Sequence, residues 1–236
     1  MASYGRIESS GIWNLESEIY FGFSVCLFFA VSVFLPLKSL SARPVSSPAT
    51  LTYTRTLQGS VPEFLLISVN REGSGAYEGR ALADPSHPVP LQLSAETTSR
   101  LFALAAELND FRGLALESHK KVANLGAKTF TYESGAEKNE VEFNFTERRE
   151  ARELTDLFER IATSEQHRQA LDYAIKYDPL SLPKELQQVE ADIENRALAD
   201  PELMVPSLEE IARNPRFLHL AQVRAESILK AVAGDP

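Results

Sequence analysis

The alternation of apolar and polar residues predicts strands in the middle of the chain. In NEVEFNFT (139–146), Val141 and Phe143 alternate with polar residues, so one face of this strand is buried and the other is wet. Glycine-containing turns at 71–75 and at Gly135 predict two hairpins. The predicted strands are residues 51–57, 63–70, 76–82, 89–93, 128–134 and 139–146.

Apolar residues three and four positions apart predict two helices that pack on this sheet. The first begins after Ser94, a good N-cap residue, and ends at Gly113. The second follows the last strand. The apolar stripe of the first helix is Leu101, Leu104, Ala105, Leu108 and Phe111, and that of the second is Leu154, Leu157, Phe158 and Ile161.

Beyond these elements no strand pattern remains, and helix signals follow one another. TSEQ (163–166) resembles a capping box and predicts a helix that ends at Asp178-Pro179. SLP (181–183) predicts the start of another helix. A second capping box, SLEE (207–210), predicts a short helix, and Asn214-Pro215 predicts the start of the last one.

The sequence therefore predicts an α+β fold with two parts. Residues 51–163 form an antiparallel sheet with two packing helices, and residues 164–236 form a small all-α helical unit. At the N-terminal side, residues 1–18 are a short tail, Ile19–Leu37 is a predicted transmembrane helix, and the Ser- and Pro-rich residues 38–50 are a linker.

The apolar run Ile19–Leu37 contains no charged residue and is bounded by Glu18 and Lys38. A helix needs about 20 apolar residues to cross a bilayer, so the run is long enough for a single span. A signal sequence cleaved after Ser41 or Ala42 is the alternative, but the acidic leader and the length favour an uncleaved anchor. We expect the soluble part to be extracytoplasmic, as in a common export design, although the few flanking positive charges favour the opposite orientation.

The formal net charge of −9 argues against nucleic acid as a partner, because nucleic-acid affinity comes largely from Lys and Arg on phosphates. The single cysteine, Cys26, lies inside the apolar run. The soluble part therefore has no disulfide, no thiolate nucleophile and no cysteine metal site. We predict that the chain binds another protein and the membrane, and that it needs no cofactor.

No residue is predicted to be catalytic, cofactor-binding or metal-binding. His87 lies near Asp84 in a proline-rich loop and is a candidate metal or base residue, but proximity in sequence does not establish a site. The positive stretch 119–121 is interpreted as a solvated loop. The glycine-containing segments 73–79 and 126–129 lack the spacing and the context of nucleotide-binding loops.

One internal similarity stands out. RALADPSHPVP (80–90) and RALADPELMVP (196–206) agree at eight of eleven positions, including the whole of 80–85 and 196–201. The first copy follows a predicted strand and the second follows a predicted helix. Duplicated units should match in their flanking periodicity, so a chance similarity between two loops is the simpler interpretation.

The first part resembles a known family in several places. TYTRT (52–56) is followed by LSAE (93–96), which opens a helix that ends at LNDF (108–111). FTYE (130–133), a glycine turn, a strand and a closing helix come next. This order is similar to the small α+β domain of the emfourin type, whose members are proteinaceous inhibitors of metallopeptidases. The chain lacks the Gly-Gly that usually follows the first Arg-Ser/Thr step of the family, so no inhibitory residue is carried over.

The final helix pair, Ser207 to Val232, resembles one HEAT-type repeat, although a lone repeat cannot bury its faces. As a whole the chain resembles bacterial single-span membrane-anchored proteins of unknown function. Our first hypothesis is a non-catalytic, membrane-anchored protein-interaction module. One alternative is an envelope-associated hydrolase whose site is not visible as a sequence motif. Another is a peptidase inhibitor.

Overall fold

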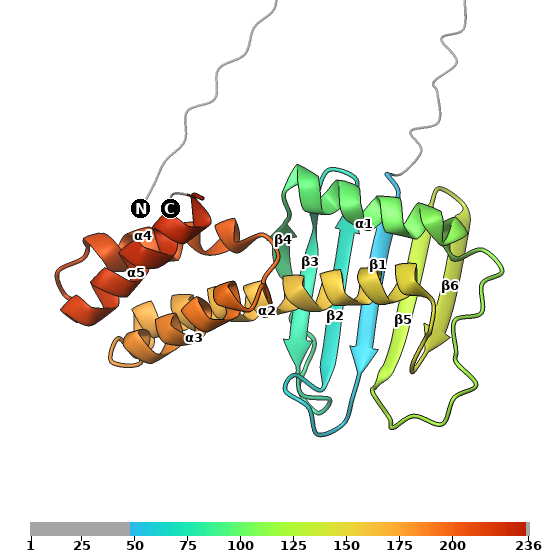
Figure 1. Cartoon of the computed structure of the whole chain (residues 1–236), viewed down its shortest axis with the longest axis horizontal. Coiled ribbons are helices and arrows are strands. Elements are labelled where there is room, and N and C mark those ends of the chain that lie inside the picture. Colours follow the sequence, from blue (N-terminus) through green and yellow to red (C-terminus); the bar gives the residue numbers. More distant parts are fainter. Residues whose placement is uncertain (1–47, 235–236) are drawn as a thin grey trace, which may run out of the picture. The chain divides into compact units, whose positions relative to one another are not determined.

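Six strands form one antiparallel sheet in the computed structural model, which describes residues 48–234 (Figure 1). Their order across the sheet is β4-β3-β2-β1-β5-β6. The two predicted hairpins are β2–β3 and β5–β6, and β1 pairs with both β2 and β5. The strands are β1 Thr50–Thr56, β2 Phe64–Asn70, β3 Ser74–Arg80, β4 Val89–Gln92, β5 Ala127–Ser134 and β6 Glu137–Phe143.

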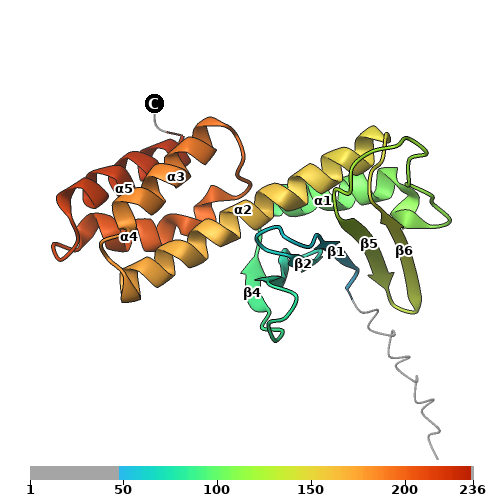
Figure 2. The same ribbon diagram turned by 90° about the horizontal axis from the view of Figure 1, so that it is seen from below.

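Five α-helices accompany the sheet within the described residues, which confirms the predicted α+β class. They are α1 Ala95–Glu107, α2 Arg149–Tyr177, α3 Leu182–Glu194, α4 Val205–Arg213 and α5 His219–Val232. Helices α1 and α2 cover one face of the sheet (Figure 1). Helix α2 then continues past the sheet and packs with α3, α4 and α5 (Figure 2).

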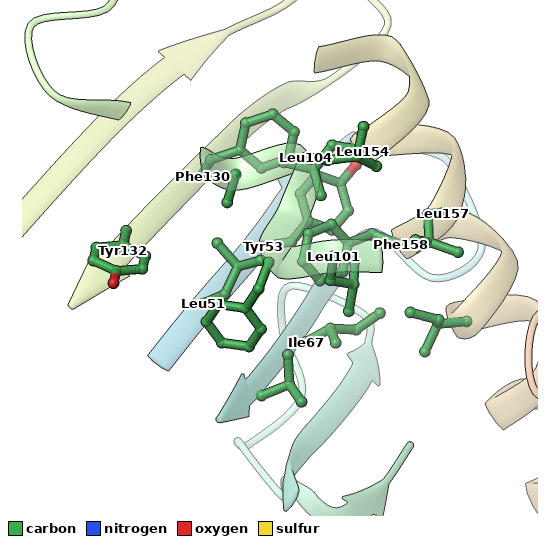
Figure 3. Packing of buried hydrophobic residues seen from close by; sticks show 14 of the residues in the cluster. Leu51, Tyr53, Ile67, Leu101, Leu104, Phe130, Tyr132, Leu154, Leu157 and Phe158 are labelled. Carbon is green, nitrogen blue, oxygen red and sulfur yellow. The ribbon is translucent and has the colours of Figure 1, made fainter. Parts of the chain in front are cut away.

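The sheet core is built from alternate strand residues and the predicted helix stripes. Tyr53 of β1 stacks on Phe158 of α2 with ring centroids 5.0 Å apart, and Phe130 of β5 lies 5.6 Å from Tyr53 (Figure 3). The residues that alternate with these along the strands, such as Thr52 and Thr54 of β1, lie on the opposite face of the sheet. The predicted stripe of the second helix, Leu154, Leu157, Phe158 and Ile161, is buried as expected.

A second, smaller core joins the C-terminal half of α2 to α3, α4 and α5. Its buried residues are Leu171, Ala174, Leu182, Leu186, Val189, Met204, Leu208, Ile211, Phe217, Ala221, Ala225 and Ile228. Helix α3 begins at Leu182 and helix α2 ends before Asp178, as the sequence predicted. One helix therefore supplies residues to both cores.

The predicted helix start at Thr163 is wrong, because α2 runs without a break from Arg149 to Tyr177. The Thr163 hydroxyl donates to the Glu159 carbonyl oxygen one turn earlier instead of capping a new helix. This helix buries apolar residues in both cores: Ile161 belongs to the sheet core and Leu171 to the smaller core. Continuous packing therefore overrides the local capping signal.

Two other predicted helix starts are also displaced. Helix α4 already begins at Val205, so Ser207 is not its N-cap, and the Ser207 hydroxyl donates to Asp172 of α2 over 2.5 Å. Helix α5 begins at His219 and not at Asn214-Pro215, because the chain makes a turn that buries Phe217 in the helical core. In both places a tertiary contact decides which residues are helical.

No helix among residues 48–234 is long and apolar enough to cross a membrane. The predicted tail 1–18, the predicted transmembrane helix Ile19–Leu37 and linker residues 38–47 lie outside the described residues.

Candidate functional site

The proline-rich loop that carries His87 is fastened to the open face of the sheet by Glu78. This carboxylate is buried and accepts hydrogen bonds from the His87 backbone N–H at 2.9 Å and from the Ser86 hydroxyl at 3.0 Å. Arg80 Nε donates to the same carboxylate over 3.0 Å. No group of three His, Cys, Asp or Glu side chains that could hold a metal lies within residues 48–234. His87 therefore contributes its backbone N–H to the attachment of the loop. Among residues 48–234, no set of metal ligands forms around its side chain.

Helices α2 and α3 bring together a serine, a histidine and an aspartate. His167 Nε2 lies 2.7 Å from Asp192 Oδ2, and Ser164 precedes His167 by one turn of α2. The Ser164 hydroxyl, however, donates to the Ala199 carbonyl oxygen at 2.6 Å and accepts from the Ala199 N–H at 3.2 Å, and it is fully buried. A hydroxyl used in this way is not an available nucleophile. These contacts hold α2 to α3 and to the segment before η2 (Pro201–Met204).

The two RALADP copies have different structures. Asp200, in the second copy, is buried with a left-handed backbone (φ 52°). Its carboxylate accepts from the Ser94 N–H at 2.7 Å, the Ser94 hydroxyl at 2.8 Å and the Thr97 hydroxyl at 2.5 Å. Asp84, at the matching position of the first copy, is exposed and offers its carbonyl oxygen to Arg80 Nη1 at 3.1 Å. The repeat is therefore not a duplicated structural unit, and only the second copy ties the helical unit to α1.

A hollow of about 690 Å³ lies between α1 and α2. Its floor is Leu104 and Leu157, and most of its charged groups already have partners. Arg100 donates to Glu153 at 2.8 Å. Glu159 accepts from the Tyr53 hydroxyl at 2.6 Å and from Arg55 at 3.1 Å. Burial and the neighbouring Glu159 raise the pKa of Tyr53. Internal pairing therefore explains the charges of Arg100, Glu153 and Glu159 without a ligand.

A smaller hollow of about 360 Å³ lies where the end of β6 meets the first turns of α2. Phe143, Phe145 and Leu125 form its apolar part. Lys128 lines it too, and its ammonium donates to three carbonyl oxygens, two of them at 2.9 Å. Burial lowers the pKa of Lys128. The other lining residues are Asn144, Thr146, Arg149, Arg152, Glu153, Thr155 and Asp156.

The two edges of the sheet are protected against the addition of another strand. The face that lacks α1 and α2 is rich in hydroxyl groups. Edge strand β4 is short and contains Pro90, which has no N–H to donate. Edge strand β6 carries charges at Lys138, Glu140 and Glu142. Central strand β1 presents only threonines to the open face, at 50, 52, 54 and 56. This arrangement discourages binding of an extended peptide at either edge.

The end of the helical unit far from the sheet presents a group of exposed apolar side chains that we call the distal patch. The α2–α3 and α4–α5 turns both lie there (Figure 1, Figure 2). Arg216 Nη2 donates to the Ile175 carbonyl oxygen at 3.1 Å and so holds the second turn beside α2. The patch comprises Tyr173 (63% exposed), Tyr177 (61%), Leu180 (76%), Leu218 (48%), Leu220 (55%) and Val223 (47%).

The sequence did not predict the distal patch. It also did not predict the clamp, by which we mean the hydrogen bonds that tie Asp200 to Ser94 and Thr97 at the start of α1. The exposed tyrosines belong to a helix whose other side is buried, and a hydrophobic stripe alone does not show which apolar residues stay outside. Comparison of the chain with protein-family models, with curated proteins and with solved structures gives no match.

Proposed function

We propose that this chain is a single-span, membrane-anchored protein-interaction module that binds another protein through the distal patch. One observation carries the proposal. Among residues 48–234, ten large apolar side chains are exposed, and six of them belong to this one end of the helical unit. Exposed apolar residues scattered singly need no explanation, whereas a concentration of them is typical of an interaction surface.

The size of the distal patch is suited to a protein partner. At the stated exposures its six side chains present about 600 Å² of apolar surface in total. A standard interface covers about 800 Å² on each partner, so side chains of this total area are enough for the apolar part of one such interface. The expected partner presents an apolar surface of similar area.

The chemistry of the patch also favours recognition. Tyr173 and Tyr177 are one turn apart, with ring centroids separated by 5.1 Å, and Lys176 Nζ lies 5.0 Å from the centre of the Tyr177 ring. Tyrosine combines a large apolar ring with a polar tip, loses little conformational entropy and is enriched at the centres of interfaces. Placement on the final turns of a long helix holds the two rings in position before a partner arrives.

Membrane attachment and an extracytoplasmic location rest on the sequence alone. Ile19–Leu37 is the proposed span, and residues 38–50 are the proposed spacer before β1. Protease treatment of intact cells tests the orientation. We expect the soluble part to be cut in intact cells, and cleavage only after lysis would reverse the assignment.

The binding surface is tested by photo-crosslinking of the full chain in cells. A benzoylphenylalanine at position 177 should form an adduct with another protein, and the same probe at Val122, an exposed residue outside the patch, should not. Adding Leu180→Ser and Leu220→Ser should weaken the adduct at 177. Equal adducts at both positions, or an adduct that the serines leave unchanged, would contradict the proposal. A product that contains only two copies of this chain would identify self-association instead of a different partner.

A further inference from the structure

We infer that the hollow between β6 and α2 binds a small monocarboxylate with an apolar or aromatic tail. This site is separate from the distal patch and is independent of the proposed protein interaction. Its volume of about 360 Å³ falls within the range of small-molecule sites. It also combines an apolar part with two arginines on one helix, which is the pattern that an amphipathic anion requires.

The wall of the hollow is held in place by the chain itself. Asn144 accepts the Leu125 N–H at 2.7 Å through its side-chain oxygen and donates to the Ala123 carbonyl oxygen at 3.1 Å. Lys128 donates to the carbonyl oxygens of Leu125 and Asn144, both at 2.9 Å. These four contacts fasten the segment before β5 to the end of β6. A ligand would therefore meet a formed wall and would not have to order it.

The apolar part of the hollow remains partly uncovered. Phe143 is buried, Phe145 is half-buried and Leu125 is 45% exposed. The Lys128 ammonium lies 6.0 Å from the centre of the Phe143 ring. Covering these side chains with an aromatic or aliphatic tail removes apolar surface from water, which is the main source of affinity in such sites.

The two arginines at the mouth have donors available for a carboxylate. Arg149 Nε lies 3.6 Å from the Glu153 carboxylate and 3.7 Å from that of Glu150, which is longer than a hydrogen bond. Arg152 forms no ion pair with any residue in the range 48–234. A guanidinium presents a planar fork of donors that matches a carboxylate, and Arg149 and Arg152 are three residues apart on α2.

The acidic residues nearby restrict the charge of the ligand. Glu153 also lines the hollow but is already bound by Arg100 at 2.8 Å. Glu147, which precedes α2, is paired with Lys120. Asp156 lines the hollow as a further carboxylate and would repel a dianion more strongly than a monoanion. A monocarboxylate is therefore favoured over a phosphate.

The test uses the full chain in lipid nanodiscs, with empty nanodiscs as the reference for partition into lipid. Phenylbutyrate should bind, and its neutral analogue phenylbutyramide should bind about tenfold more weakly, as expected for loss of charge-assisted hydrogen bonds. The double variant Arg149→Gln, Arg152→Gln should weaken phenylbutyrate binding by at least about tenfold. Arg148→Gln, which removes a neighbouring charge outside the hollow, is the matched control and should change the affinity little.

Isothermal titration gives the affinities, and amide chemical shifts locate the ligand. Shifts confined to residues 123–128 and 143–156 support the proposal. Equal affinity for the acid and the amide, no effect of the double variant, or no binding at about 1 mM each overturns it. The double variant should keep the adduct at position 177, so this inference and the proposed protein interaction fail separately.

Discussion

The sheet core and the helical core share helix α2 but are built from different side chains. The sheet core contains a cluster of aromatic rings around Phe130, with contacting centroids 5.0–6.2 Å apart. Its members are Tyr53, Phe111, Phe130, Phe143 and Phe158. The helical core is mainly aliphatic, and among its buried members only Phe217 is aromatic. The first core is covered by two helices on a wide sheet, whereas the second is enclosed by the C-terminal half of α2 and three shorter helices.

This difference shows where each unit leaves apolar surface. A small unit has a high ratio of surface to volume, so it cannot bury all of its apolar residues. Leu180 and Leu220 remain exposed at the end of the helical unit, while Leu65 and Ile67 of the sheet are fully buried. The larger unit is mostly closed, and the smaller unit presents the surface that we propose for a partner.

Replacing Phe158 by alanine should have the largest effect on stability. Phe158 is fully buried and stacks on Tyr53, so we expect a loss of about 3–5 kcal/mol in the free energy of unfolding. Because α2 belongs to both cores, urea unfolding should show one transition, with hydrogen exchange rising together in both units. Phe64→Ala on the open face of the sheet is the matched control, with a smaller loss. Two separate transitions would show that the cores are independent.

Asp200→Asn should have the next largest effect, because it removes the charge that Ser94 and Thr97 bind. We expect the free energy of unfolding to fall by about 1.5–3 kcal/mol. Because asparagine tolerates the left-handed backbone at this position, the decrease comes from loss of the carboxylate and not from backbone strain. Hydrogen exchange should increase at the start of α1. Asp84→Asn in the first RALADP copy is the control and should change stability by less than about 0.5 kcal/mol. Equal losses at both positions would remove the distinction between the copies.

Tyr53→Phe should cost about 1 kcal/mol near neutral pH, through loss of the hydrogen bond to Glu159. Burial raises the pKa of Tyr53 above its ordinary value of 10.0. Above pH 10 the unfolded state therefore loses its proton while the folded state keeps it, and the stability that is fully present below pH 10 is lost as the pH rises. In the Tyr53→Phe variant, the free energy of unfolding should fall less steeply above pH 10 than in the wild type. Phe130→Leu should lower stability without changing that slope, and parallel curves for wild type and Tyr53→Phe would contradict the prediction.

Leu180→Ser should have the smallest effect on stability, within about 0.5 kcal/mol, because the side chain is 76% exposed. The fully buried Leu182, two residues later, is the matched position, and Leu182→Ser should cost about 3 kcal/mol or more. Only Leu180→Ser should weaken the crosslink at position 177 while the fold remains intact. Thermal unfolding measures the first difference, and similar melting temperatures for the two variants would contradict it.

Much of the sheet could be predicted from local pattern. The strand predicted at 51–57 is observed as β1 Thr50–Thr56, because alternation with β-branched residues and a single buried face leaves one register. The hairpin at 128–146 is observed as β5 and β6 for the same reason. The start of α5 could not be predicted, since burial of Phe217 in a turn, and not a capping residue, decides it.

The sequence by itself determined the α+β class, the strand faces and the apolar stripes of the helices, because these depend on periodicity along the chain. Tertiary structure alone decided that one helix serves two cores, that Asp200 and not Asp84 clamps α1, and that six apolar residues stay exposed at one end of the helical unit. Each of these depends on residues far apart in the chain. The same RALADP segment is a solvated loop or a buried clamp according to what lies beside it in space.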